Sequence, residues 1–128
     1  MDQATDTVYT ANLADGEGPG TVSVINGATC NGHDIKGCGL IATAPAGFGA
    51  NGIAIDRTTH DVYVTNSEDT SVSVIDGTKC NGTDTSGCSH TPAKDSAGAY
   101  FASIAIDPAV RTAFVRTIDG VSVIPLTH

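Results

Sequence analysis

Apolar and polar residues alternate in short runs along most of the chain. The clearest run is S-V-S-V-I at residues 71–75, in which valine alternates with serine. This two-residue period predicts a β-strand with one buried face. No segment carries an apolar stripe with a period of 3.6 residues, so the pattern predicts no helix. We therefore expect an all-β fold made of short strands.

The strand pattern repeats at an interval of about 51 residues. The segment I-A-I-D-R-T-T-H-D-V-Y-V-T-N at residues 53–66 matches I-A-I-D-P-A-V-R-T-A-F-V-R-T at residues 104–117. Residues 21–32 likewise match residues 71–82, and the first twelve residues match the first segment again. Self-similarity at this period indicates stacked units, none of which can bury its own sheet face alone.

Each unit is predicted to hold four strands. In the complete central unit they are expected at residues 52–56, 61–65, 71–75 and 91–95. The earlier copy places its last strand at residues 40–44. Four antiparallel strands in a repeat of this length are typical of a β-propeller blade. A β-sandwich is the alternative fold.

The two ends of the chain interrupt this repeat. We divide it into an incomplete first blade (residues 1–48), a complete second blade (49–98) and an incomplete third blade (99–128). About ten strands are expected, which form an incomplete ring because propellers close with about four to eight blades. Both terminal sheets should then present an uncovered apolar face, which favours a homo-oligomer or a fragment of a longer propeller.

Three short motifs in the repeat point to a known family. They are V-Y-V-T-N at 62–66, V-Y-T-A-N at 8–12 and S-V-I-D-G at 73–77, and they resemble the YVTN family of β-propeller repeats. The resemblance implies a bacterial or archaeal protein that is secreted or held at the cell surface. The last copy departs from the motif, since Thr117 stands where the others have Asn12 and Asn66.

Four cysteines lie in two matching C-x7-C loops, C-N-G-H-D-I-K-G-C and C-N-G-T-D-T-S-G-C. Because each loop is glycine-rich and neighbouring blades should hold the two loops apart, we predict the disulfides Cys30–Cys38 and Cys80–Cys88. The spacing does not suit zinc, whose cysteine pairs usually lie two to four residues apart. Disulfides indicate an oxidising compartment, hence an extracellular or cell-surface location. The segment M-D-Q-A-T-D has no signal-peptide pattern.

The formal net charge is −8, with only six lysine and arginine residues. Nucleic-acid binding needs a basic face that replaces counterions on phosphate, so this charge argues against it. Anionic membrane surfaces are disfavoured for the same reason. No apolar run approaches the roughly 20 residues that span a bilayer, so we expect no membrane insertion.

Candidate ligand-binding residues lie in the loops that enter the first strand of each blade and in those that join the second and third strands. In propellers, ligands tend to bind near the axis on this side, so the assignment is by analogy. Tyr100 and Phe101 offer rings that stack on a sugar or a peptide, although packing between blades explains them too. The candidates are Phe48, Asn51, Glu68, Asp69, Tyr100, Phe101 and Arg116.

Residues with catalytic chemistry do not form a recognisable set. None of the histidines recurs at a matching position, so we expect each in a solvent-exposed loop; they are His33, His60, His90 and His128. The aspartates at positions 2, 56 and 107 do recur, and an Asx cap of a tight turn is their expected role. Glycine-rich loops such as residues 15–20 lack the spacing of calcium ligands. We predict no catalytic residues, no metal and no cofactor.

The repeat architecture and the disulfides favour an extracellular, non-catalytic module that binds a protein or a glycan through its loops. One alternative is a lyase or hydrolase whose axial site is assembled by several chains or by a longer parent protein. The other is a self-associating structural or surface-layer subunit. Rigid β-repeats support all three functions, so the distinction depends on which side chains the fold brings together.

Overall fold

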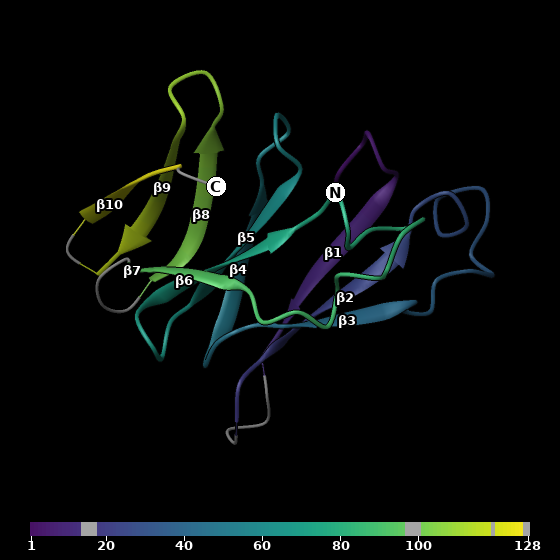
Figure 1. Cartoon of the computed structure of the whole chain (residues 1–128), viewed down its shortest axis with the longest axis horizontal. Helices are drawn as coiled ribbons and strands as arrows, with labels where there is room; N and C mark the ends of the chain where they lie inside the picture. The colour runs from purple at the N-terminus through teal and green to yellow at the C-terminus, as the bar shows by residue number, and fades with distance from the viewer. Residues whose placement is uncertain (14–17, 97–100, 119, 127–128) are drawn as a thin grey trace.

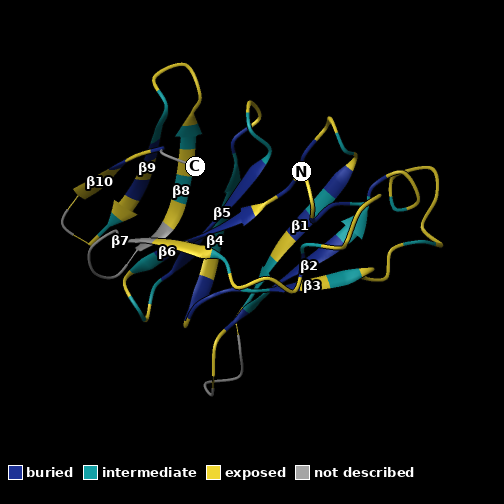
Figure 2. Ribbon diagram, in the orientation of Figure 1, coloured by how far each residue is buried: buried dark blue, intermediate teal, exposed yellow. Residues whose placement is uncertain are grey.

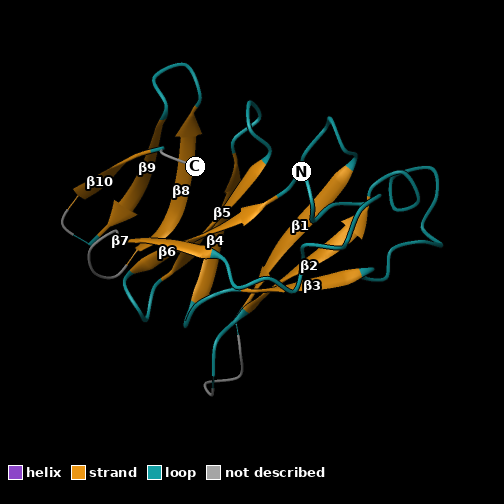
Figure 3. Ribbon diagram, in the orientation of Figure 1, coloured by secondary structure: helices purple, strands orange, loops and turns teal. Residues whose placement is uncertain are grey.

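The computed structural model describes residues 1–13, 18–96, 101–118 and 120–126. Its described residues contain ten strands and no helix (Figure 3). The all-β prediction is therefore confirmed. Likewise, the described residues include no helix long and apolar enough to cross a membrane.

The strands form three antiparallel sheets that follow one another along the molecule (Figure 1). The first sheet contains β1 (Thr7–Asn12), β2 (Thr21–Asn26) and β3 (Ala42–Pro45). The second contains β4 (Ala50–Ile55), β5 (Asp61–Asn66), β6 (Ser71–Asp76) and β7 (Ala93–Ser96). The third contains β8 (Phe101–Asp107), β9 (Thr112–Thr117) and β10 (Gly120–Pro125). Three, four and three strands are the numbers that the repeat predicted.

Two details of the strands differ from the prediction. Strand β4 begins at Ala50, and its pairing with β5 shifts register between Ala50 and Ile53. The observed strand therefore includes Ala50 and Asn51, which the apolar pattern did not predict as part of it. The last strands of the first and second sheets begin two residues later than expected, at Ala42 and Ala93. Both are short strands without a strong alternating pattern.

Successive sheets pack face to face, a contact that propeller blades share with β-sandwiches. The side chains of β5 are all buried because this strand lies inside the middle sheet, as Figure 2 shows. Val62 and Val64 join a cluster with Tyr9 of the first sheet. Tyr63, between them in sequence, joins a second cluster with Val115 of the third sheet. The alternation along one strand thus supplies both interfaces.

The predicted disulfides are both present, with Cys30 bonded to Cys38 and Cys80 bonded to Cys88. Their formation is consistent with an oxidising compartment. The two loops differ in burial, since Cys80 and Cys88 are buried whereas Cys38 is exposed. The first sheet accounts for the burial of the second loop, because Cys80 and Cys88 pack in a cluster with Tyr9 and Val22 of that sheet.

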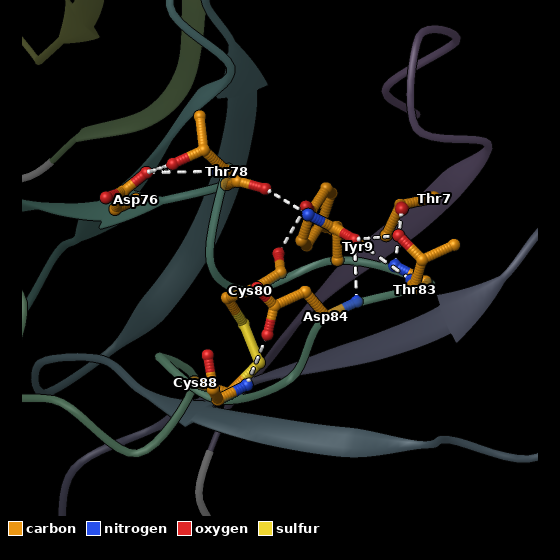
Figure 4. Close-up of a disulfide and its surroundings, with 12 residues drawn as sticks. Thr7, Tyr9, Asp76, Thr78, Cys80, Thr83, Asp84 and Cys88 are labelled. Carbon is orange, nitrogen blue, oxygen red and sulfur yellow. Dashed lines mark hydrogen bonds between the residues drawn. A yellow bond between two sulfur atoms is a disulfide. The ribbon is translucent and has the colours of Figure 1, made fainter.

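The second loop contacts the first sheet directly (Figure 4). The Tyr9 hydroxyl donates a hydrogen bond of 2.6 Å to the backbone carbonyl of Cys80. The backbone N–H of Gly82 donates one of 2.8 Å to the Thr7 hydroxyl. Burial raises the pKa of Tyr9 to about 12, and the nearby charge of Asp2 adds to this effect. The hydroxyl therefore remains a donor throughout the physiological pH range.

Candidate functional site

The turn that leads into β1, β5 or β9 carries one of the recurring aspartates in each sheet. In all three copies the Oδ1 atom accepts a hydrogen bond from the backbone N–H two residues further on. The predicted Asx role is therefore confirmed for Asp2, Asp56 and Asp107. This turn leaves the Oδ2 atom available for another partner.

In two of the three copies, that partner comes from the next sheet. Nδ1 of His60 lies 2.9 Å from Oδ2 of Asp2, and Nη1 of Arg111 donates to Oδ2 of Asp56. His60 and Arg111 occupy the same position of the repeat, and both have a left-handed backbone, with φ of 65° and 51°. We call this recurring link the turn contact. It joins each sheet to the one before it.

The turn contact corrects one expectation for the histidines. His60 was expected in a solvent-exposed loop, but its side chain is only 28% exposed because it reaches the buried carboxylate of Asp2. His33 and His90 are exposed, as expected. His128 lies outside the described residues. Asp2, the partner of His60, is 58 positions away in sequence, so the local pattern around His60 gave no sign of the contact.

The carboxylate of Asp56 is fully buried, while the Arg111 side chain is 36% exposed. Burial opposes the ionisation of Asp56. However, hydrogen bonds from the Thr58 N–H and from Arg111, together with the arginine charge, outweigh burial. The pKa of Asp56 therefore lies below its ordinary value. A buried carboxylate paired in this way is stable, whereas the same carboxylate without its cation is costly.

Three of the loop candidates lie together where β3 connects to β4 and β5 connects to β6. The Asp69 carboxylate accepts hydrogen bonds from the Phe48 N–H, at 3.1 Å, and from the Ser71 hydroxyl. Glu68 donates its N–H to the Phe48 carbonyl at 3.1 Å. Partial burial opposes ionisation of Asp69, but the bonds from Ser71 and Phe48 and the charge of Lys94 lower its pKa overall. Asp69 thus holds two connections of its own chain together.

The other candidates are not part of this cluster. Asn51 is exposed on β4. Arg116 was expected in a connecting loop, but it lies within β9, where its side chain is exposed. Strand β9 continues to Thr117, so the loop is shorter than the sequence suggested. Tyr100 and the side chain of Phe101 lie outside the described residues.

An open pocket of about 310 Å³ borders the second disulfide loop. Sequence reasoning did not identify it, since its lining comes from β5, β6 and the segment before β7. Its polar lining side chains are those of Asp61, Asp76, Lys79, His90 and Thr91. Within the described ranges, no three histidine, cysteine, aspartate or glutamate residues are grouped so as to hold a metal ion.

The third sheet exposes a row of apolar side chains on the side that faces away from the second sheet. In β9, Ala113 and Val115 are buried against the second sheet, whereas the intervening residues are exposed. Ala105 and Val123 pair in register with Phe114, which continues the row across all three strands. We call this surface the outward face. It consists of Ala105, Phe114, Val121 and Val123.

The second sheet provides an internal reference for the outward face. Phe114 is 39% exposed, whereas Tyr63, at the same position of the repeat, is 1% exposed. Val123 is 62% exposed, whereas its equivalent Val74 is 6% exposed. In Figure 2, β5 is buried along its length, whereas β10 is largely exposed. The residues are alike in kind, so the difference comes from the sheet that covers one set and not the other.

No protein-family model matches the chain, and a search of curated proteins found no significant match. The outward face is therefore identified from the difference in exposure between equivalent residues of the repeats in this chain. In the two internal interfaces, equivalent surfaces are covered by a following sheet.

Proposed function

We propose that this chain is an extracellular, non-catalytic interaction module built from YVTN-type propeller blades. It binds its partner through the outward face of the third sheet. One observation carries the proposal: Phe114 and Val123 are exposed, although the equivalent Tyr63 and Val74 are buried under the next sheet. Exposed, contiguous apolar side chains are typical of protein-interaction sites.

The energy available from burying this face is of the size that weak association requires. Complete burial of a valine or phenylalanine side chain stabilises a complex by roughly 1.5–3 kcal/mol. Phe114, Val121 and Val123 are 39%, 63% and 62% exposed, so burial of their remaining surface contributes roughly 2.5–5 kcal/mol in total. This gain is comparable with the lower part of the range, about 4–15 kcal/mol, for the free-energy cost of association.

The loop candidates support this choice of surface. The Asp69 carboxylate and the Phe48 backbone are occupied by contacts within the chain. The His60–Asp2 pair has the elements of a catalytic dyad, but the equivalent pair in the next repeat is Arg111–Asp56. Arginine remains protonated and does not act as a general base, so a shared role in linking sheets is the simpler explanation.

The chain itself is the probe that tests this function. Sedimentation equilibrium over a range of concentrations should reveal weak self-association of the wild type. Val123→Asp places a charge on the outward face and should yield a monomer. Asn51→Asp is the control, because Asn51 is also exposed but lies on β4 of the second sheet, away from the outward face. Circular dichroism checks that both variants fold. Equal masses for all three proteins at every concentration would contradict the proposal.

A further inference from the structure

The outward face includes a charge as well as apolar side chains. Strand β8 ends at Asp107, whose Oδ1 atom accepts the Ala109 N–H at 2.9 Å, as in the other two copies. Asp2 and Asp56 are buried, but Asp107 is exposed. Within the described residues, the Oδ2 atom of Asp107 has no cationic partner. The turn is therefore prepared for a turn contact that the third sheet does not complete.

The two completed turn contacts define what should face Asp107. In both cases the following sheet supplies a nitrogen donor from the residue four positions after its own aspartate. One donor is the imidazole of His60 and the other is the guanidinium of Arg111. A charged donor such as the arginine guanidinium forms stronger hydrogen bonds with a carboxylate than a neutral donor does.

The first sheet carries a different residue at this position. Asp6 has the same left-handed backbone as His60 and Arg111, with φ of 53°, and its side chain is exposed. A second copy of the chain stacked on the outward face in the geometry of the internal interfaces would bring Asp6 opposite Asp107. Two carboxylates in a contact that excludes water repel each other, and like charges across an interface suppress the wrong partner.

From these observations we infer that the outward face selects its partner by charge. It accepts a β-sheet of a partner chain that presents an arginine, lysine or histidine opposite Asp107, and it binds a second copy of this chain only weakly. This inference rests on the proposed function, since it specifies the partner of the same face. The apolar row supplies affinity, and the turn contact supplies the specificity.

A titration with designed partners tests the inference. Fluorescently labelled wild type at low concentration provides the outward face. The partners all carry Val123→Asp, which prevents them from offering an outward face of their own. One partner is otherwise unchanged and presents Asp6, while the other also carries Asp6→Arg and presents the donor found at Arg111. We expect the arginine partner to bind at least about tenfold more tightly.

Two controls separate the turn contact from a general effect of charge. Glu68→Arg in the Val123→Asp partner makes the same change of net charge at an exposed site in the turn between β5 and β6. This control should leave the affinity unchanged. Asp107→Asn in the labelled chain should remove the advantage of the Asp6→Arg partner. Arginine at position 6 suits the backbone there, because Arg111 has nearly the same φ.

The outcomes distinguish this inference from the proposed function. Equal gains from Asp6→Arg and Glu68→Arg would overturn charge selection, while the outward face would remain the binding surface. A labelled chain that carries Val123→Asp and still binds the Asp6→Arg partner would overturn the proposed function itself. Tighter binding of the partner that presents Asp6 would refute the selection of a cation outright.

Discussion

The two disulfide loops permit a matched comparison within one molecule. Each ring joins cysteines eight positions apart. The chain-entropy model therefore assigns the same stabilisation to both, about 2.6 kcal/mol. The pair Cys80 and Cys88 is also buried, whereas the first pair is not. We predict that replacing the second pair by alanine destabilises the protein more than replacing the first.

The size of the difference follows from the contacts of the second loop. Removing two buried sulfur atoms costs roughly 0.8 kcal/mol each, by comparison with a buried methylene. A looser loop also weakens the hydrogen bonds from Tyr9 to Cys80 and from Gly82 to Thr7, which are worth about 1 kcal/mol each. The second double variant should therefore lose about 5 kcal/mol and the first about 2.6 kcal/mol.

Urea denaturation followed by circular dichroism measures both losses under the same conditions. The free energies of unfolding should differ by about 2 kcal/mol or more between the two variants. Equal losses would mean that the packing of the second loop on the first sheet contributes nothing to stability. A greater loss from the Cys30 and Cys38 variant would refute the reasoning entirely.

Two further predictions concern contacts between sheets. Tyr9→Phe should lower the free energy of unfolding by about 1–2 kcal/mol, because the Cys80 carbonyl loses its donor, and urea denaturation of the variant beside the wild type measures this. Arg111→Ala should cost roughly 2–3 kcal/mol at pH 7, because it leaves the buried carboxylate of Asp56 without its cation, with allowance for the partial exposure of the arginine. Because the pKa of Asp56 is lowered, the ionised pair stabilises the protein above the ordinary value of 3.8 and is lost as pH falls through the folded-state pKa. Wild type and Arg111→Ala should therefore converge in stability in acid, and a constant difference down to pH 2 would contradict this.

The strands could be predicted because each depends on local alternation. Val72 and Val74 alternate with serine, and β6 occupies the range that this pattern indicates. The disulfides followed from the repeat, because the two loops are equivalent and separate. The Asx turns also involve neighbouring residues, as in the bond from Thr58 to Asp56.

Contacts between sheets could not be predicted in this way. His60 lies 58 positions from Asp2 in sequence, and Arg111 lies 55 positions from Asp56. The aligned repeats place histidine and arginine at one position, but alignment does not reveal what either residue faces. The contact of Asp69 could not be predicted either, because its partner Phe48 lies in the connection between β3 and β4. Burial of these groups depends on the distance between sheets, which the alternating pattern does not encode.

The direction of the turn contact has a consequence for how such a chain can lengthen. The second sheet carries a donor for the preceding sheet, His60, and an acceptor for the following one, Asp56. A duplicate of this whole unit, inserted beside the original, would offer each neighbour a nitrogen donor or a carboxylate acceptor at the position where that neighbour needs one. Duplication of a complete unit therefore creates no unpaired buried charge, whereas duplication of part of a unit would leave a buried carboxylate without its donor.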